Sequence, residues 1–134
     1  MRRKRAVILV IVILILAAAL LVIRGIYRNI ESNLKLLADT ALAQIDMAAL
    51  EDGTYLGSYS VFPVSAKVSV TVRDHRITAI DLMEHKNGQG ALAEAIPGKV
   101  LDAQSLQVDV VAGATYSSKV ILKAIENALL GRQP

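Results

Sequence analysis

The stretch that decides the fold is Ala66–Arg76, which reads A-K-V-S-V-T-V-R-D-H-R. Apolar and polar residues alternate over its first eight positions, and a period of two is typical of a β-strand with one buried and one solvated face. Asp74 and His75 follow as a two-residue connection, the shortest that joins antiparallel strands. Such turns require φ > 0, which histidine tolerates better than most residues. The stretch therefore predicts a β-hairpin whose second strand covers Arg76–Glu84.

Further elements are expected on both sides of this hairpin. Residues 54–60 are aromatic and small and suit a strand, after a break at Glu51-Asp52-Gly53. On the other side we expect a short helix at 91–96 ended by Pro97-Gly98, a second at 99–105, a strand at 106–111, and a closing helix that stops at Gly131. This irregular order predicts an α+β domain over residues 51–131, with helices packed on a small antiparallel sheet.

A long apolar segment, Ala6–Ile23, precedes this domain. It holds 18 consecutive apolar residues, close to the about 20 that a membrane-spanning helix needs. The basic tail of residues 1–5 predicts a cytoplasmic N-terminus and an extracytoplasmic domain in a cell membrane. The alternative is a cleaved signal peptide with its cleavage site at Ala17–Ala19, although this apolar run exceeds the roughly 7 to 15 residues of a signal core.

The connecting segment, residues 24–50, shows apolar residues at spacings of three and four from Ile30 to Ala48. This pattern predicts an amphipathic helix over about Asn29–Leu50. Two arrangements are open. The helix is either a stalk that continues the anchor, or it lays its apolar stripe on the domain.

Composition excludes several classes of function. The chain has 15 basic and 12 acidic residues, but six of the basic ones lie in Arg2–Arg28, so the remainder carries 9 − 12 = −3. Because no positive cluster lies on the domain, no nucleic-acid partner is expected. The absence of cysteine excludes disulfides, thiolate metal sites and a cysteine nucleophile. His75 and His85 form no metal-binding pair, and we expect both to be solvated loop residues.

The segment Asp109–Ser118, D-V-V-A-G-A-T-Y-S-S, carries the chemistry. A predicted strand enters a turn of small residues, and hydroxyl side chains crowd the first turn of the helix that follows. A helix N-terminus offers unpaired N–H groups and a positive dipole end, which favour a bound phosphate. Gly113 lets the backbone adopt φ > 0. The plainer alternative is that Thr115 is an N-cap and that Ser117 and Ser118 are solvated.

The segment resembles the flavinylation motif of the FMN-binding domain family, Asp-x-x-(Ser/Thr)-Gly-Ala-Thr, which occurs in the C subunit of sodium-translocating NADH:quinone oxidoreductase and the G subunit of the Rnf complex. Asp109, Gly113, Ala114 and Thr115 match the motif. The resemblance extends over Glu51–Gly131. Ala112 departs from the motif and removes a hydroxyl. This change weakens covalent attachment more than it weakens flavin binding.

The resemblance implies FMN as the cofactor. The phosphate would be esterified to Thr115 by a separate, Mg-dependent FMN transferase that uses FAD. Gly113 and Ala114 would shape the phosphate site, and Ser117 and Ser118 would hydrogen-bond the phosphate. Asp109 would either be recognised by the transferase or hold the end of the strand in place. The loop that begins at His85 lies either beside the flavin or plainly on the surface.

Two functions follow. The first is an electron carrier, tethered near a membrane redox partner that it serves at a raised effective concentration. No acid, base or nucleophile constellation accompanies the motif, so we expect an electron-transfer component and no stand-alone enzyme. The alternative is an accessory or sensory membrane module that binds FMN non-covalently or binds no flavin.

Overall fold

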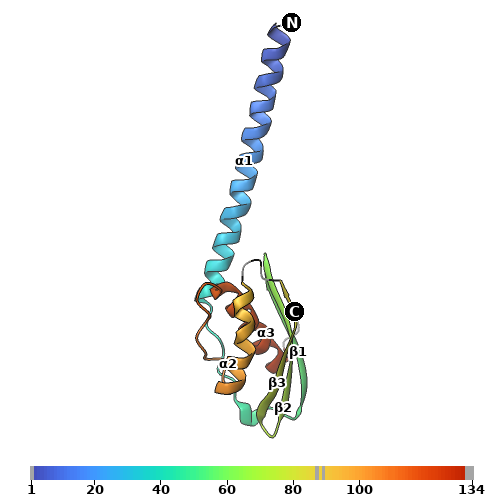
Figure 1. Cartoon of the computed structure of the whole chain (residues 1–134), viewed down its shortest axis with the longest axis vertical. Coiled ribbons are helices and arrows are strands. Elements are labelled where there is room, and N and C mark those ends of the chain that lie inside the picture. The colour runs from blue at the N-terminus through green and yellow to red at the C-terminus, as the bar shows by residue number, and fades with distance from the viewer. Residues whose placement is uncertain (1, 87, 89, 132–134) are drawn as a thin grey trace. The chain divides into compact units, whose positions relative to one another are not determined.

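The structure is a computed structural model that describes residues 2–86, 88 and 90–131. The chain divides into two compact units, Met1–Ser32 and Asn33–Pro134. Figure 1 shows the helices and strands along the chain. In order they are α1 (Arg2–Asp39), the 3-10 turn η1 (Met47–Ala49), β1 (Gly53–Val61), β2 (Val64–Arg73), β3 (Arg76–Lys86), the 3-10 turn η2 (Ala91–Ala95), α2 (Ile96–Ala103) and α3 (Thr115–Leu129).

The sheet is antiparallel, with strand order β1-β2-β3. Burial alternates along β2, where Val68, Val70 and Val72 are fully buried and the residues between them are not. The tight turn into β3 has φ values of 50° at Asp74 and 58° at His75, as a two-residue hairpin requires. The hairpin predicted from the valine alternation is confirmed.

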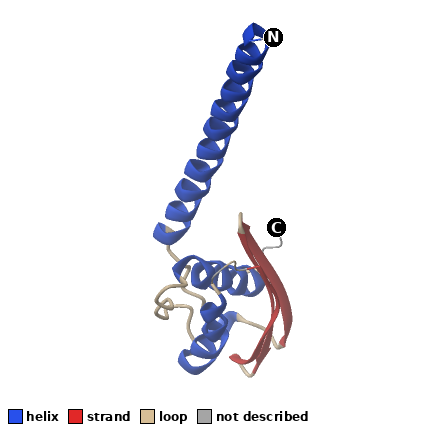
Figure 2. Cartoon of the chain, turned by 45° about the horizontal axis from the view of Figure 1, so that its top comes forward, coloured by secondary structure: helices blue, strands red, loops and turns tan. Residues whose placement is uncertain are grey.

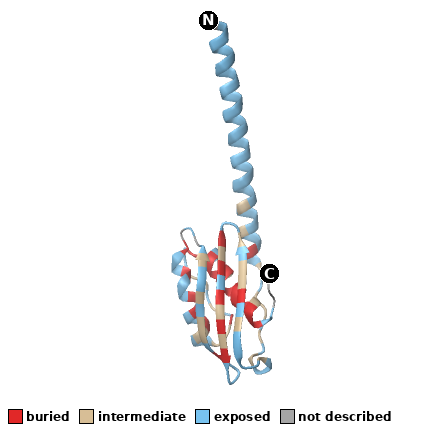
Figure 3. Ribbon diagram, turned by 90° about the vertical axis from the view of Figure 1, so that its right-hand side faces the viewer, coloured by how far each residue is buried: buried red, intermediate tan, exposed pale blue. Residues whose placement is uncertain are grey.

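Both helices of the domain cover the same face of the sheet, as Figure 2 shows. α3 packs on β1 and β2, while α2 packs on β3. Figure 3 shows that buried residues concentrate on the central strand and on the helices behind it. The core between these layers includes Val68, Val70, Ile96, Ile121 and Ile125, all fully buried. The predicted α+β fold with a small antiparallel sheet is confirmed.

Side-chain amides satisfy backbone groups on the two edge strands. Gln104, in a left-handed conformation at the end of α2, accepts from Ile77 N and donates to Ile77 O, at 2.9 and 2.8 Å. Asn127 of α3 donates to Ser58 O on β1 at 2.9 Å. Because an edge strand exposes unpaired groups that invite another strand, these amides protect both edges while attaching them to the helical layer.

The helix predicted over Asn29–Leu50 ends earlier than expected. α1 runs from Arg2 only to Asp39, and Thr40 Oγ1 donates to Leu36 O at 2.7 Å where it stops. The next residues are irregular, yet their apolar side chains still reach the core: Leu42, Ile45, Met47 and Leu50. Each of the two open arrangements therefore holds in part, because α1 continues the apolar segment and the chain after it packs on the domain.

Two further predictions fail. Pro97-Gly98 does not stop a helix but lies in the first turn of α2, where proline loses no backbone hydrogen bond. Residues 106–111 form no strand. Their backbone groups pair with side chains instead, since Gln107 N donates to Ser105 Oγ and Asp109 O accepts from Lys99 Nζ.

α1 is long and apolar enough to cross a membrane, with a mean hydropathy of 3.6 over its most apolar 18-residue window and none of that window buried. Within the described residues no other helix meets these criteria. An N-terminal signal sequence also meets these criteria, so they do not by themselves separate a signal sequence from a membrane span.

Residues 40–43, which follow α1, are attached to the domain by three polar contacts. Thr40 O accepts from Lys119 Nζ at 3.3 Å, and Leu42 O accepts from Gln107 Nε2 at 3.4 Å. Ala43 N donates to the carboxylate of Glu126, which is 2% exposed and also pairs with Lys123. Two of these three contacts come from α3, so the segment after α1 is attached directly to the helix that begins at Thr115.

Candidate functional site

A tight turn precedes α3 and carries Gly113 at its third position. Ala114 N donates to Val111 O at 3.0 Å, which closes the turn, and Gly113 has φ of +78°. A turn of this kind requires a positive φ at that position, so glycine is the residue that fits. A side chain there would meet nothing within 4 Å. The space beside the turn is therefore open, as the predicted close approach of a ligand needs.

The N-terminus of α3 lacks a side-chain cap. Ala114 is the N-cap residue and makes no capping hydrogen bond, while Thr115 is the first helical residue. The interpretation of Thr115 as a plain N-cap is therefore wrong. Ser118 N donates to Ala114 O at 2.8 Å, so the N–H groups of the three residues before it are those that a helix leaves without an intrahelical partner. The exposed Thr115 stands among these donors.

The two serines of α3 are not solvated as the plainer interpretation had them. Ser117 is 2% exposed and Ser118 is fully buried. Ser118 Oγ accepts a hydrogen bond from Val111 N at 3.0 Å. Together with the bond from its own N–H to Ala114 O, this contact attaches Ser118 to both ends of the turn. The structure thus gives the Ser118 hydroxyl a partner in the protein, where the resemblance implied a phosphate.

Replacing Ser118 with alanine tests this structural role. The variant leaves the partly buried Val111 N–H without its acceptor, and we expect a loss of about 1–1.5 kcal/mol in the free energy of unfolding. Thr115→Ala, at an exposed position, is the matched control, and its free energy of unfolding is expected to stay within about 0.5 kcal/mol of that of the wild type. Urea unfolding of the full chain in detergent, followed by circular dichroism, measures both. Equal stability of the two variants would contradict the role.

Asp109 and His85 lie in different parts of the domain. The side chain of Asp109 is exposed in the segment before the turn, and its carbonyl accepts from Lys99 Nζ at 3.2 Å. His85 belongs to β3, and its side chain is only 3% exposed, with Nδ1 3.2 Å from Glu94 Oε1 of η2. The prediction of a solvated loop histidine is therefore wrong for His85. The rest of its predicted loop includes Asn87, which lies outside the described residues.

The structure thus brings Gly113, Ala114, Thr115 and the two serines together at one helix terminus. Lys99 and Gln107 also support the segment that leads there, and sequence reasoning missed both. Neither lies in a motif, because each acts through a backbone carbonyl that only the fold brings near. Among the described residues, no cluster of three or more histidine, aspartate or glutamate side chains is placed to hold a metal ion.

Comparison with known proteins identifies the family to which this chain belongs. A family model, "FMN-binding domain", matches residues 64–130, which is 67 of the 134 residues. The matched region runs from the start of β2 through the closing helix. The chain belongs to the FMN-binding domain family. FMN is therefore its cofactor, and the family resemblance inferred from Asp109, Gly113, Ala114 and Thr115 is confirmed.

Two relatives show the range of proteins that carry similar sequence. An uncharacterized protein of Treponema pallidum (strain Nichols) is 32% identical over 90 residues, which cover 65% of this chain and 25% of the relative. The NADH:acrylate oxidoreductase of Vibrio harveyi is 37% identical over 65 residues, 46% of this chain and 6% of the relative. This chain spans a quarter or less of these relatives, so their whole activities do not transfer to it.

The residues at the start of α3 fit the phosphate of FMN. A phosphate is an anion with several acceptor oxygens, and it matches unpaired N–H donors at the positive end of a helix. The absence of a side-chain cap at Ala114 leaves those donors available, and the open space beside Gly113 leaves room for the group. The Thr115 hydroxyl is the aliphatic hydroxyl at this terminus that is not buried, since both serines are buried; the neighbouring Tyr116, which is 37% exposed, carries a phenol instead.

Proposed function

We propose that this protein is a membrane-anchored flavoprotein that carries FMN covalently at Thr115 and relays electrons between a membrane redox partner and an acceptor. The observation that carries the proposal is the exposed Thr115 hydroxyl at an uncapped helix N-terminus, in a chain of the FMN-binding family. The attached flavin supplies the redox chemistry, because none of the side chains at this terminus is itself redox-active.

Each group at the terminus has a distinct part in holding the cofactor. The N–H groups of residues 115–117 bind the phosphate, while Gly113 and Ala114 keep the approach free of bulk. Ser118 holds the turn in place from inside the core, through Val111 N. Ser117 contributes its backbone N–H and not its hydroxyl, because its side chain is buried. Asp109 is exposed and remains available for recognition by the transferase.

The attachment reaction is a phosphoryl transfer. The Thr115 oxygen forms an ester bond to the phosphorus of the FMN moiety, and the pyrophosphate bond of FAD breaks, so that AMP leaves and the hydroxyl loses its proton. An FMN transferase supplies the Mg²⁺ and the active site for this step. The chain itself contributes the exposed acceptor hydroxyl and the donors that hold the phosphate afterwards.

Reversible reduction of the bound flavin tests the relay. The full chain is produced together with an FMN transferase, purified in detergent, reduced with dithionite and reoxidised with a soluble electron acceptor. The flavin absorbance should disappear and return in full over repeated cycles. A chain that contains no flavin under these conditions would contradict the carrier function and favour the alternative, an accessory module. Flavin that dissociates in denaturant would contradict only the covalent linkage.

In the proposed topology the domain faces away from the cytoplasm, and the support is that four basic residues precede the span and only Arg24 and Arg28 follow it closely. Protease added outside intact cells should digest the domain and leave a fragment that contains Ala6–Ile23. A control protein of the cytoplasm must survive the same treatment. Full protection of the domain until the cells are lysed would reverse the proposed orientation, and with it the side on which the transferase acts.

A further inference from the structure

The first turn of α3 holds positive charge that acidic side chains do not offset. A helix N-terminus is the positive end of the helix dipole, and aspartate or glutamate in the first turn usually stabilises it. α3 has no acidic residue in its first turn. The first charged side chain of the helix is instead that of Lys119. An anion bound at this terminus would therefore meet an ammonium in addition to the helix dipole.

Lys119 is partly buried, and no carboxylate pairs with its ammonium among the residues that the structure describes. Its Nζ atom donates to Thr40 O at 3.3 Å, a contact with an uncharged group. A lysine ammonium has three N–H donors, and this bond uses one of them. A charge that leaves water without a counterion lowers stability. The surroundings of Lys119 thus favour an anion as a further partner.

Lys119 and Thr115 lie one helical turn apart. Side chains at positions i and i+4 of a helix are neighbours, with about 5–6 Å between their Cβ atoms, and this is a spacing at which opposite charges pair. In a helix the Cα–Cβ bonds tilt toward the N-terminus, so a lysine leans back over the preceding turn. Ser118, which is three residues from Thr115, is fully buried. An anion carried by Thr115 would therefore lie within reach of Lys119.

We propose that Lys119 binds the phosphate of the attached flavin and neutralises its charge. The proposal rests on the attachment of FMN to Thr115 that is proposed above. Once the phosphate is esterified to both Thr115 and the ribityl chain, it is a diester with one negative charge. The N–H groups of residues 115–117 bind it along the helix axis, and the Lys119 ammonium donates to it from the side of the helix.

Thr40 has a part in this contact. Its carbonyl holds the Lys119 ammonium through one donor and leaves the other two for the phosphate oxygens. Because the lysine side chain is already ordered by this bond, less conformational entropy is lost when the phosphate binds. Hydrogen bonds between an ammonium and a phosphate are also stronger than those to a neutral carbonyl. The phosphate therefore gains a partner that the fold has placed beforehand.

The sequence allows a test within one sample, because no lysine or arginine lies between Lys99 and Lys119. Thr115 and Lys119 therefore remain on the same peptide after digestion with trypsin. The full chain is produced with an amount of FMN transferase that modifies only part of it, purified in detergent and acetylated briefly with an N-hydroxysuccinimide ester. Mass spectrometry then reports FMN and the acetyl group of Lys119 on the same peptide.

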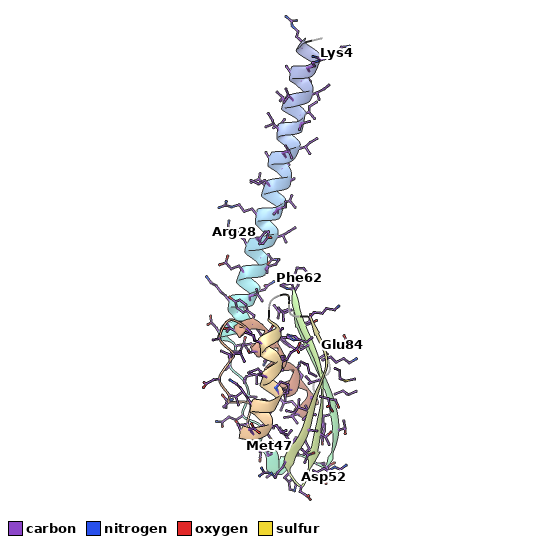
Figure 4. The ribbon with its side chains drawn as sticks, viewed as in Figure 1. Lys4, Arg28, Met47, Asp52, Phe62 and Glu84 are labelled. Atoms are coloured by element: carbon purple, nitrogen blue, oxygen red, sulfur yellow. The ribbon has the colours of Figure 1, made fainter. Side chains whose placement is uncertain are left out.

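We expect Lys119 to be acetylated at least threefold less on peptides that carry FMN than on those that do not. An amine that donates to a phosphate is shielded and is kept in its charged form, which does not react with the ester. Lys67 is the control, because it opposes Glu84 in register, and Figure 4 shows Glu84 on the face of the sheet away from the helices. The acetylation of Lys67 should be the same in preparations made with and without the transferase.

Two variants separate the charge of Lys119 from mere cover by the flavin. Lys119→Arg keeps the positive charge, while Lys119→Gln offers an N–H donor to Thr40 O but removes the charge. The melting temperature of each full chain is measured with and without attached FMN, by circular dichroism in detergent. We expect attachment to raise it at least twice as much in the wild type and in Lys119→Arg as in Lys119→Gln. Increases that are equal in all three chains, or absent from all three, would overturn the proposal.

The acetylation experiment also distinguishes this proposal from the proposed function. If no peptide carried FMN in any preparation, the attachment itself would fail and the role of Lys119 would be overturned with it. If FMN were found on Thr115 but Lys119 were acetylated equally on both kinds of peptide, only the role of Lys119 would be overturned, and the flavin would remain attached as proposed.

Discussion

Thr115→Ala is expected to abolish covalent flavin completely and to leave the domain folded. The reason is geometric, because Thr115 is exposed at the first position of α3 while Ser117 and Ser118 are buried and offer no substitute hydroxyl. Wild-type and variant chains are produced with an FMN transferase and run on a denaturing gel. Flavin fluorescence should stay with the wild-type band and be absent from the variant band.

A matched control separates loss of the nucleophile from loss of the site. Thr115→Ser keeps a hydroxyl at the same position and is expected to retain a fluorescent band, at a reduced or equal intensity. Circular dichroism of all three chains should show the same helix content. Persistent fluorescence in Thr115→Ala would move the attachment to another residue, whereas an unfolded variant would show that Thr115 has a structural role that its exposure does not suggest.

Gly57→Ala is expected to destabilise the domain strongly, since β1 approaches the backbone of α3 at this glycine. A Cβ at Gly57 would lie only 2.7 Å from Ala128 Cβ, and it would also overlap Ala124 O and Ala128 N. Backbone atoms of a packed helix cannot move aside as a flexible side chain does. Forcing the layers apart places the effect at the upper end of the usual range for overpacking, about 3 kcal/mol or more, and lowers the melting temperature by about 10 °C or more.

Gly53→Ala provides the control in the same strand. A Cβ at Gly53 would meet only the Tyr55 ring, at 3.7 Å, which is ordinary van der Waals contact. Its stability should stay within about 0.5 kcal/mol of the wild type. Thermal unfolding of the full chains in detergent, followed by circular dichroism at 222 nm as the usual helix signal, compares the two. If Gly57→Ala melted together with Gly53→Ala, β1 and α3 would not pack as closely as described.

The elements that could be predicted from the sequence are those with one face buried against a neighbouring layer and the other face in solvent. Val68, Val70 and Val72 alternate because one face of β2 is covered by helices and the other is solvated, and this is a local signal of a sheet. The strand at 54–60 and the closing helix were predicted for similar reasons, and β1 and α3 confirm them. Asp74 and His75 predicted the hairpin because a connection of two residues is typical of antiparallel strands.

The segments that were mispredicted are those whose apolar side chains pack without regular backbone pairing. Leu106, Val108 and Val111 pack on the core as a strand would, yet Ser118 and Lys99 take the backbone bonds of that segment. Past Asp39, Ile45 of the predicted apolar stripe packs on the core in the same way, whereas Ala41 and Ala48 of that stripe are exposed. Periodicity reports which side chains are buried, and it does not report the partners of N–H and C=O groups.

The candidate site was predicted in its place but not in its details. The motif indicated Gly113, Ala114 and Thr115, and the structure places them at the start of α3. The serines require the fold to interpret, because their burial depends on the layer beneath α3. Likewise, nothing local indicated that Gly57 faces Ala124 and Ala128 across the interface.

The mass of the intact chain tests the central claim most directly. After production with an FMN transferase, the wild-type chain should be heavier than its sequence by one FMN less one water, as a phosphoester requires. Fragmentation should place that increment on the peptide that contains Thr115. A chain of unmodified mass, or an increment on a peptide without Thr115, would contradict the account.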